Sequence, residues 1–152
     1  MPLDGRRRAT ALVMAPLLAP VLALAGCGRD PAGPVPGEVP VFGGIDADET
    51  ITALGNEPFW SARIDGAQLT YSTPDNLQGE AVAVTRFAGN GGLGISGTLG
   101  GAPLQLAITP GACSDGMSDR TYPYGATLAI GDVTLSGCAY TDAQPFSGGS
   151  RP

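Results

Sequence analysis

Three two-residue turn signals constrain the fold of this chain more than any other feature of its sequence. They are Asp65-Gly66, Gly100-Gly101 and Gly131-Asp132, and each lies between two stretches in which apolar and polar residues alternate. Such dipeptides favour the tight turns of antiparallel hairpins. Because a slip of one residue would turn every side chain to the opposite face, turn and alternation together predict a register for each hairpin.

The predicted registers gather the apolar residues of each hairpin on one face. In the first hairpin, Ile64 pairs with Ala67, Ala62 with Leu69 and Trp60 with Tyr71. In the second, Leu93, Ile95, Gly97 and Leu99 lie opposite Ile108, Leu106, Leu104 and Ala102. In the third, Ala126, Leu128 and Ile130 lie opposite Gly137, Leu135 and Val133. We expect Trp60 in the core and its neighbour Phe59 on the outside, because successive side chains of a strand point to opposite faces.

Two further stretches complete the set of predicted strands. These are "ITAL" at 51–54 and "EAVAVTRF" at 80–87, and no window of the chain shows a helical period. The sequence therefore predicts an all-β domain, a small antiparallel meander of seven to eight strands with one disulfide. The meander closes into a barrel or folds as a sandwich, since an open sheet would leave long unpaired edges.

The N-terminal segment predicts export to the cell envelope. Arginines at positions 6–8 precede a short apolar run that ends in "LAGC" at Cys27. The run is shorter than the roughly 20 residues of a membrane-spanning helix, so we interpret residues 1–26 as a lipoprotein signal peptide. The thiol of Cys27 then receives a diacylglycerol, unless this is an ordinary signal peptide with a chance cysteine. Gly28 stands where an Asp would favour inner-membrane retention, so we expect an outer-membrane anchor facing the periplasm.

Composition divides the remainder into three parts. Residues 27–48 are rich in proline and glycine, which is typical of a tether. Residues 49–140 contain the predicted strands, and residues 141–152 are expected to be a disordered tail. With Cys27 lipidated, Cys113 and Cys138 remain in an oxidising compartment, and we expect them to form a disulfide.

Charge and missing residue types narrow the possible functions. The chain has no histidine, so the commonest general base and metal ligand are both lacking. After removal of residues 1–26 it has five arginines, no lysine and thirteen acidic residues, a net charge of −8. This charge argues against nucleic-acid binding, which depends on Lys and Arg contacts to phosphates. It suits solubility or a cationic protein partner. We expect no catalytic residues, no cofactor and no metal.

One segment, "ACSDGMSDRTYPYG" at 112–125, is far richer in functional groups than the rest of the chain. Its candidate residues are Asp115, Gly116, Met117, Ser118, Asp119, Arg120 and Tyr122. The structural interpretation is a loop held by the disulfide, in which the Arg120 guanidinium bridges carboxylates and carbonyls while Tyr122 and Tyr124 cover the base. The alternatives are partner binding, calcium binding by Asp115 and Asp119 without EF-hand spacing, and glycoside hydrolysis by paired carboxylates.

These motifs also carry a resemblance. "GNEPFWSARIDGAQLTYSTPD", "CSDGMSDRTYPYGA" and "LSGCA" resemble a family of small, uncharacterised bacterial lipoproteins, over residues 55 to 139. The layout is more loosely similar to membrane-bound inhibitors of c-type lysozyme and to META-domain lipoproteins. The inhibitors' recognition motif is not found here, so no inhibitory residue is carried over.

The sequence as a whole predicts a non-enzymatic periplasmic lipoprotein that binds an envelope component or protein, with the 113–125 loop at or beside the contact surface. Its expected partners are the membrane, through the N-terminal lipid, and a cationic, lysozyme-like protein. Two alternatives stay open: a lysozyme inhibitor of the membrane-bound type, and a purely structural envelope lipoprotein.

Overall fold

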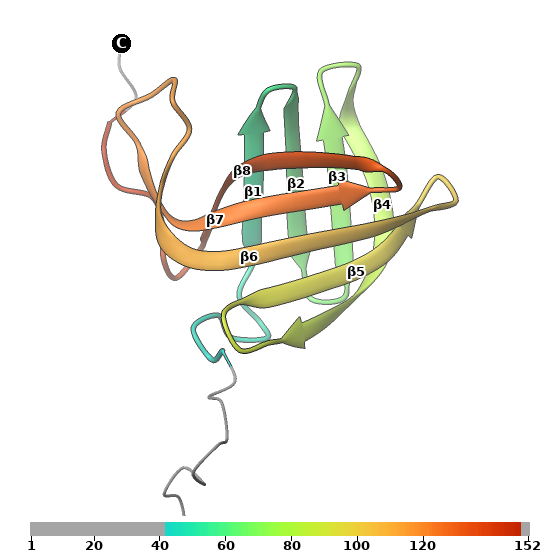
Figure 1. Ribbon diagram of the computed structural model, residues 1–152, viewed down its shortest axis with the longest axis horizontal. Coiled ribbons are helices and arrows are strands. Elements are labelled where there is room, and N and C mark those ends of the chain that lie inside the picture. Colours follow the sequence, from blue (N-terminus) through green and yellow to red (C-terminus); the bar gives the residue numbers. More distant parts are fainter. Residues whose placement is uncertain (1–41, 150–152) are drawn as a thin grey trace, which may run out of the picture. The chain divides into compact units, whose positions relative to one another are not determined.

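The protein folds as a closed antiparallel barrel of eight strands (Figure 1). The structure is a computed structural model, and it describes residues 42–149. The strands are β1 (Ile51–Asn56), β2 (Phe59–Asp65), β3 (Gln68–Thr73), β4 (Asn76–Ala88), β5 (Leu93–Leu99), β6 (Ala102–Ser114), β7 (Thr121–Ile130) and β8 (Val133–Thr141). Each strand pairs with the next, and β8 returns to β1. The all-β prediction is confirmed, and the architecture is the barrel rather than the sandwich.

The barrel is built from two groups of strands that cross at a steep angle. In Figure 1, β1 to β4 run nearly perpendicular to β5 to β8. The 13-residue strand β4 turns this corner, pairing with β3 through residues 76–83 and with β5 through residues 84–88. Gly97 faces β4 there, where a Cβ would lie 2.8 Å from the Ala83 carbonyl oxygen. A glycine allows the close backbone approach that the bend requires.

Two of the three predicted registers are confirmed and the first is wrong by two residues. The pairs of β5 with β6 and of β7 with β8 are those expected. In the first hairpin Ile64 pairs with Leu69 and Ala62 with Tyr71, because the loop is Gly66-Ala67. Gly66 has the positive φ, +55°, that this loop demands. A two-residue slip preserves the face of each strand residue, so Ala62, Ile64 and Leu69 are buried as predicted. Ala67, which was predicted to face inward, lies exposed in the loop.

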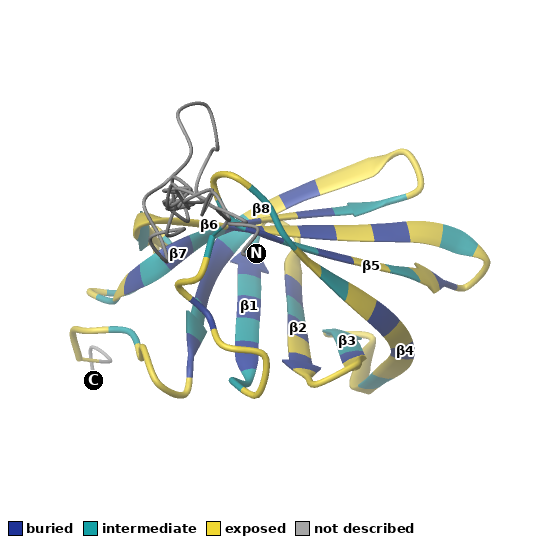
Figure 2. Cartoon of the chain, turned by 90° about the horizontal axis from the view of Figure 1, so that it is seen from below, coloured by how far each residue is buried: buried dark blue, intermediate teal, exposed yellow. Residues whose placement is uncertain are grey.

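Alternation along the strands produces the core. Buried and exposed residues follow one another along the strands in Figure 2. The inward side chains come from all eight strands and include Ile51, Trp60, Ile64, Leu69, Val84, Ile95, Leu104, Leu106, Ile108, Tyr124, Leu128 and Leu135. Trp60 is buried and Phe59 is 53 % exposed, as expected from their adjacent positions in β2. A barrel of this strand number has an interior just wide enough for side chains to fill.

The folded part of the chain extends beyond the expected boundaries at 49 and 140. Before β1, Ile45 is buried in the core, and the Arg86 guanidinium donates hydrogen bonds to the carbonyls of residues 46, 47 and 49. After β8, Phe146 packs on Tyr122, and Ser147 pairs with Thr121. Within residues 42–149 no helix is suited to crossing a membrane. The predicted signal peptide, Cys27 and most of the tether lie outside the described residues.

Candidate functional site

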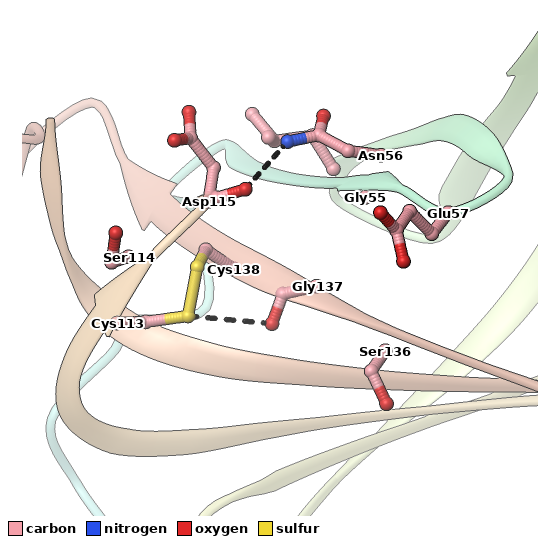
Figure 3. A pocket seen from close by; sticks show the side chains of 10 residues that line it. Gly55, Asn56, Glu57, Cys113, Ser114, Asp115, Ser136, Gly137 and Cys138 are labelled. Carbon is pink, nitrogen blue, oxygen red and sulfur yellow. Dashed lines mark hydrogen bonds between the residues drawn. A yellow bond between two sulfur atoms is a disulfide. The ribbon is translucent and has the colours of Figure 1, made fainter. Parts of the chain in front are cut away.

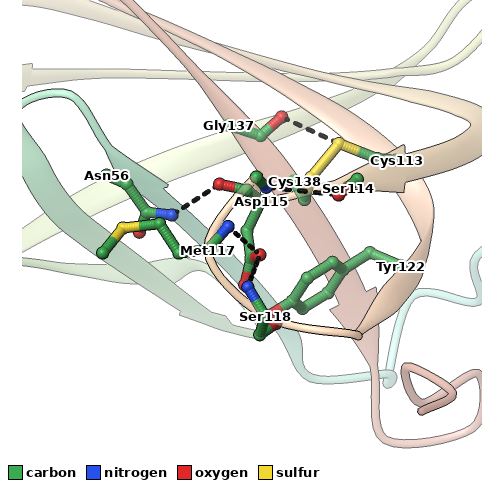
Figure 4. Close-up of a disulfide and its surroundings, with 10 residues drawn as sticks. Asn56, Cys113, Ser114, Asp115, Met117, Ser118, Tyr122, Gly137 and Cys138 are labelled. Carbon is green, nitrogen blue, oxygen red and sulfur yellow. Dashed lines mark hydrogen bonds between the residues drawn. A yellow bond between two sulfur atoms is a disulfide. The ribbon is translucent and has the colours of Figure 1, made fainter. Parts of the chain in front are cut away.

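The 113–125 segment forms the end of the β6–β7 hairpin, and the predicted disulfide holds it to β8 (Figure 4). Cys113 in β6 and Cys138 in β8 have their Cα atoms 5.7 Å apart. The ladder between β6 and β7 reaches Ser114 and Thr121, so residues 115–120 are the tip, which we call the 115–120 loop. The disulfide therefore fixes the loop to a strand other than the two that it connects.

The carboxylate of Asp115 organises this loop. Its Oδ1 accepts hydrogen bonds from the backbone N–H groups of Met117 (3.0 Å) and Ser118 (2.8 Å). Its Oδ2 accepts from the Ser118 hydroxyl (2.8 Å) and the Tyr122 hydroxyl (3.1 Å). These hydrogen bonds lower the pKa of Asp115 from 3.8 to about 2. The Ser118 hydroxyl has the largest effect, and the two backbone N–H groups come next. The Asp115 carboxylate thus organises the loop from within.

Arg120 joins the loop to the segment that follows β8. Its guanidinium carbon lies 4.4 Å from the centre of the Phe146 ring, within the range of a cation–π contact. Phe146 in turn packs against Tyr122 and Tyr140, with ring centres 5.4 and 5.2 Å away. Burial raises the pKa of Tyr122, although its hydrogen bond with Arg120 opposes this effect. The base of the loop is therefore an aromatic cluster, to which Phe146 belongs although sequence reasoning placed it in a disordered tail.

Asn56 links the two sequence motifs, and sequence reasoning missed it. Its amide donates a hydrogen bond of 2.8 Å to the Asp115 carbonyl oxygen across 59 positions of the chain. The stretch that begins "GNEPFW" and the 112–125 segment thus meet at one end of the barrel. In the sequence, Asn56 follows Gly55, and such a pair indicates a turn. Nothing in this local pattern indicates the contact with Asp115.

A groove of about 420 Å³ opens where these motifs meet (Figure 3). Its lining comes from the end of β1, the β1–β2 turn, the end of β6 and the middle of β8, and consists of Leu54, Gly55, Asn56, Glu57, Cys113, Ser114, Asp115, Ser136, Gly137 and Cys138. Glu57 and Asp115 are the acidic residues of this lining, and the Asp115 carboxylate is hydrogen-bonded within the loop and its base. The groove therefore has acidic residues beside the loop.

The candidate residues of the loop divide into buried and displayed groups. Tyr122 is 1 % exposed and belongs to the aromatic cluster. Met117 at the tip is 70 % exposed, beside Gly116, which adopts a positive φ of +71°. Asp119 is also exposed. The structure thus brings all seven candidate residues together, with Asp115 and Ser118 supporting the backbone from which Met117 projects.

The state of the Asp115 carboxylate argues against the glycoside hydrolysis and calcium binding that the sequence left as alternatives for this loop. A carboxyl group with a pKa of about 2 is ionised at neutral pH, so Asp115 is not the protonated acid that glycoside hydrolysis needs. Both of its oxygens already accept hydrogen bonds from the loop. In residues 42–149 no three His, Cys, Asp or Glu side chains are grouped so that they could hold a metal ion.

A scan of protein-family models, a search of curated proteins and a search of solved structures each find no match to this chain. The resemblance of its motifs to small bacterial lipoproteins therefore stays a prediction.

Proposed function

We propose that this chain is a non-enzymatic lipoprotein of the bacterial cell envelope, anchored by a lipid on Cys27 to the outer membrane and facing the periplasm. Its barrel binds a cationic protein, and the 115–120 loop forms the contact surface together with the acidic groove beside it. The anchor is supported by the lipobox-like sequence, and the binding surface by the geometry of the loop.

The observation that carries this proposal is the exposure of Met117 on a rigid support. The disulfide, the Asp115 carboxylate and the Asn56 amide hold the loop from three sides. A rigid loop loses little conformational entropy on binding, which favours affinity. An apolar, adaptable methionine 70 % exposed at its tip is suited to packing against a partner.

Charge supports a cationic partner. Residues 42–149 contain eleven acidic residues and three arginines, a net charge of −8. Glu57, Asp115 and Asp119 lie in or next to the groove and the loop. Complementary charge mainly accelerates association and selects the partner, whereas apolar contacts such as that of Met117 slow dissociation.

A c-type lysozyme is the first partner to test, because it is cationic and because the layout of the chain is loosely similar to lysozyme inhibitors. Hydrolysis of cell walls by lysozyme is titrated with the full chain in detergent. We expect inhibition near one-to-one stoichiometry that weakens as salt screens the charges. The Met117→Ser variant should raise the concentration needed for inhibition at least tenfold while its melting temperature is unchanged.

Phe87→Ser is the matched control, since Phe87 is 72 % exposed on β4 outside the loop and the groove. Equal losses in both variants would argue against a specific role of the loop. Unimpaired lysozyme, together with no cationic protein retained from an envelope extract, would contradict the proposed binding function.

A purely structural envelope lipoprotein is the second candidate, and the internal use of the Asp115 carboxylate favours it. All four hydrogen bonds of that carboxylate stay within the loop and its base. On this alternative, Asp115 variants lower stability and Met117 variants change nothing that can be measured.

A further inference from the structure

A second groove, of about 290 Å³, lies on the outer face of strands β2, β3 and β4, and we call it the Phe59–Leu77 groove. Its lining consists of Phe59, Trp60, Ser61, Ser72, Thr73, Pro74 and Leu77. Phe59 and Ser61 alternate along β2 with buried residues, which puts the groove on the outside of the barrel. Ser61 and Ser72 pair across β2 and β3, and their small side chains leave room between the larger ones.

Two large apolar side chains of this groove are exposed to solvent. Phe59 is 53 % exposed and Leu77 is 80 % exposed. An apolar side chain that stands alone on a surface is normal, whereas apolar groups that share one patch with a polar rim mark interaction sites. The groove has the volume of the smallest ligand pockets, about 300 Å³. It is therefore suited to a single side chain of a partner rather than to a larger ligand.

A β-bulge holds Leu77 in its exposed position. Residues 76–80 of β4 lie opposite residues 71–73 of β3, so β4 has two extra residues at this point. Gly79 within the bulge has a positive φ of +76°, and its N–H donates a hydrogen bond of 3.2 Å to Asn76 Oδ1. Because a bulge changes the direction of the side chains beside it, the exposure of Leu77 is a property of the backbone and not of a flexible end.

Asn56 connects the Phe59–Leu77 groove to the 115–120 loop. In the ladder between β1 and β2, Asn56 pairs with Phe59. The Asn56 amide donates to the Asp115 carbonyl oxygen, and the Met117 N–H donates to the carboxylate of the same aspartate. In Figure 4 the side chain of Met117 accordingly lies beside Asn56. One partner protein can therefore contact the loop and the groove together.

Acidic side chains stand in the two turns next to the groove. Glu57 is exposed in the β1–β2 turn, two residues before Phe59. Asp75 is exposed in the β3–β4 turn, two residues before Leu77, and Figure 1 shows both turns at the same end of the sheet. Arg63 is exposed on β2 four residues after Phe59, which is about 13 Å further along the strand. A basic residue of a partner is therefore favoured at the turn end of the groove and disfavoured at the Arg63 end.

We propose that the Phe59–Leu77 groove takes an apolar side chain of the cationic partner, with a basic residue of the partner at the end where Glu57 and Asp75 stand. This inference rests on the proposed function and adds a second contact to that of Met117. An apolar side chain that fills a pocket supplies affinity, and the charges beside it select the partner. The net charge of −8 in residues 42–149 repels an anionic membrane surface, so a protein is the favoured occupant.

Two labelled peptides test the proposal by fluorescence anisotropy. The full chain is anchored in nanodiscs of phosphatidylcholine, because a detergent would compete for an apolar groove. The probe is a fluorescein-tagged "GSRFRSG" peptide, and its control is "GSRSRSG", which keeps the charge and removes the apolar side chain. We expect the phenylalanine peptide to bind at least tenfold more tightly. Equal binding of the two would overturn the groove as an apolar site and leave charge attraction, and with it the proposed cationic partner, intact.

Variants of two exposed apolar residues of β4 place the binding in the groove. Leu77→Ser should remove the preference for the phenylalanine peptide. Phe87→Ser is its matched control, since Phe87 is 72 % exposed on the same strand and outside the groove, and it should keep the preference. Both variants should melt at the temperature of the original chain because neither side chain is buried. Loss of the preference in both variants, or in neither, would overturn the proposal.

Two single-charge variants test where the basic residue lies. Asp75→Asn should weaken the binding of both peptides by about threefold, as for an exposed ion pair. Arg63→Gln neutralises one charge at the other end of the same face and should not weaken binding. Weaker binding with Arg63→Gln and unchanged binding with Asp75→Asn would overturn the proposed orientation.

The lysozyme titration separates this inference from the function on which it rests. Loss of inhibition with Met117→Ser but not with Leu77→Ser would overturn the groove alone. Binding of neither lysozyme nor the phenylalanine peptide would remove the proposed function as well, whereas a peptide preference without lysozyme inhibition would support the groove for another cationic protein. Sedimentation velocity tests the remaining occupant. A dimer that Leu77→Ser converts to a monomer would assign the groove to a second copy of the chain and overturn the proposal.

Discussion

At the scale of single residues, Asp115 and two glycines determine how the site end of the barrel is built. The Asp115 carboxylate accepts three hydrogen bonds from the loop and one from Tyr122 at its base. Gly55 and Gly137 allow β1, β8 and the Trp60 indole to approach one another closely, since a Cβ at Gly55 would lie 2.1 Å from Trp60 Nε1. The hydrogen bonds of the loop thus depend on an aspartate at position 115, and the packing around Trp60 depends on glycine at positions 55 and 137.

The lowered pKa of Asp115 predicts how its contribution to stability depends on pH. A carboxyl group whose pKa is lower in the folded than in the unfolded state stabilises the fold above the unfolded pKa, and this contribution is lost as the pH falls through the folded pKa. With values of 3.8 and about 2, the loss occurs between about pH 4 and pH 2. Asp115→Asn should therefore lower the melting temperature at pH 7, and the difference from the original chain should shrink across that interval.

Thermal unfolding followed by circular dichroism from pH 7 to pH 2 measures this effect. Asp48→Asn, a change of an exposed carboxylate outside the loop, is the control and should leave the melting temperature at pH 7 nearly unchanged. A difference for Asp115→Asn that stays constant down to pH 2 would show that the carboxylate charge is not what stabilises the loop.

Gly137 supplies a prediction about packing. A Cβ there would lie 2.0 Å from the Leu54 carbonyl oxygen and 3.0 Å from Trp60 Cζ2, so Gly137→Ala forces backbone to move. We expect a loss of about 1–3 kcal/mol in the free energy of unfolding, as for overpacked cores. Gly43→Ala, where nothing lies within 4 Å of the added carbon, should change it by less than about 0.5 kcal/mol. Urea denaturation compares the two, and equal effects would argue against the close approach.

At the scale of elements, the disulfide joins two strands, β6 and β8, that do not pair with each other in the sheet. The β6 and β8 strands are neighbours of β7 rather than of each other, and the disulfide joins Cys113 near the end of β6 to Cys138 in the middle of β8. The loop therefore depends on this bond as well as on the hydrogen bonds of the Asp115 carboxylate and of the Asn56 amide.

Removal of this bond should cost stability by a predictable amount. It closes a loop with a sequence separation of 25, for which loop entropy in the unfolded chain corresponds to about 3–4 kcal/mol. The double variant Cys113→Ser with Cys138→Ser should lose that amount in urea denaturation. Reduction of the original chain with dithiothreitol should reproduce the loss, and the double variant should not respond to dithiothreitol. A much smaller loss would show that the unfolded chain is already compact.

Sequence reasoning reached the strands and their faces but not every contact of the site. The registers at Gly100-Gly101 and Gly131-Asp132 were predictable because two adjacent turn residues fix the pairing of their flanks. At Asp65-Gly66 the glycine takes the first position of the two-residue loop, as Gly100 and Gly131 do in the other hairpins, so the loop is Gly66-Ala67 and the pairing differs by two residues from the prediction. The hydrogen bond from Asn56 to Asp115 spans 59 positions, and no local pattern reports such a contact.

At the scale of the whole molecule, the dominant property is an excess of negative charge. Residues 42–149 contain eleven acidic side chains and three arginines, so repulsion between carboxylates opposes the compact state. Raising NaCl from 10 to about 200 mM shortens the Debye length to below about 10 Å and should raise the melting temperature by a few degrees. Differential scanning fluorimetry measures this, with an uncharged osmolyte of equal osmolality as the control. A melting temperature that falls with salt would mean that attractive ion pairs dominate instead.

The sequence by itself determined the local features: the strands, the face of most strand side chains, two of the three hairpin registers and the pair of cysteines that bond. These follow from a two-residue period and from turn chemistry, which act between neighbours along the chain. Only the tertiary structure decided that β8 closes on β1, that the closure stops at Cys138, and that Phe146 joins the base of the loop. Closure depends on twist and stagger accumulated over eight strands, and no short segment encodes that sum.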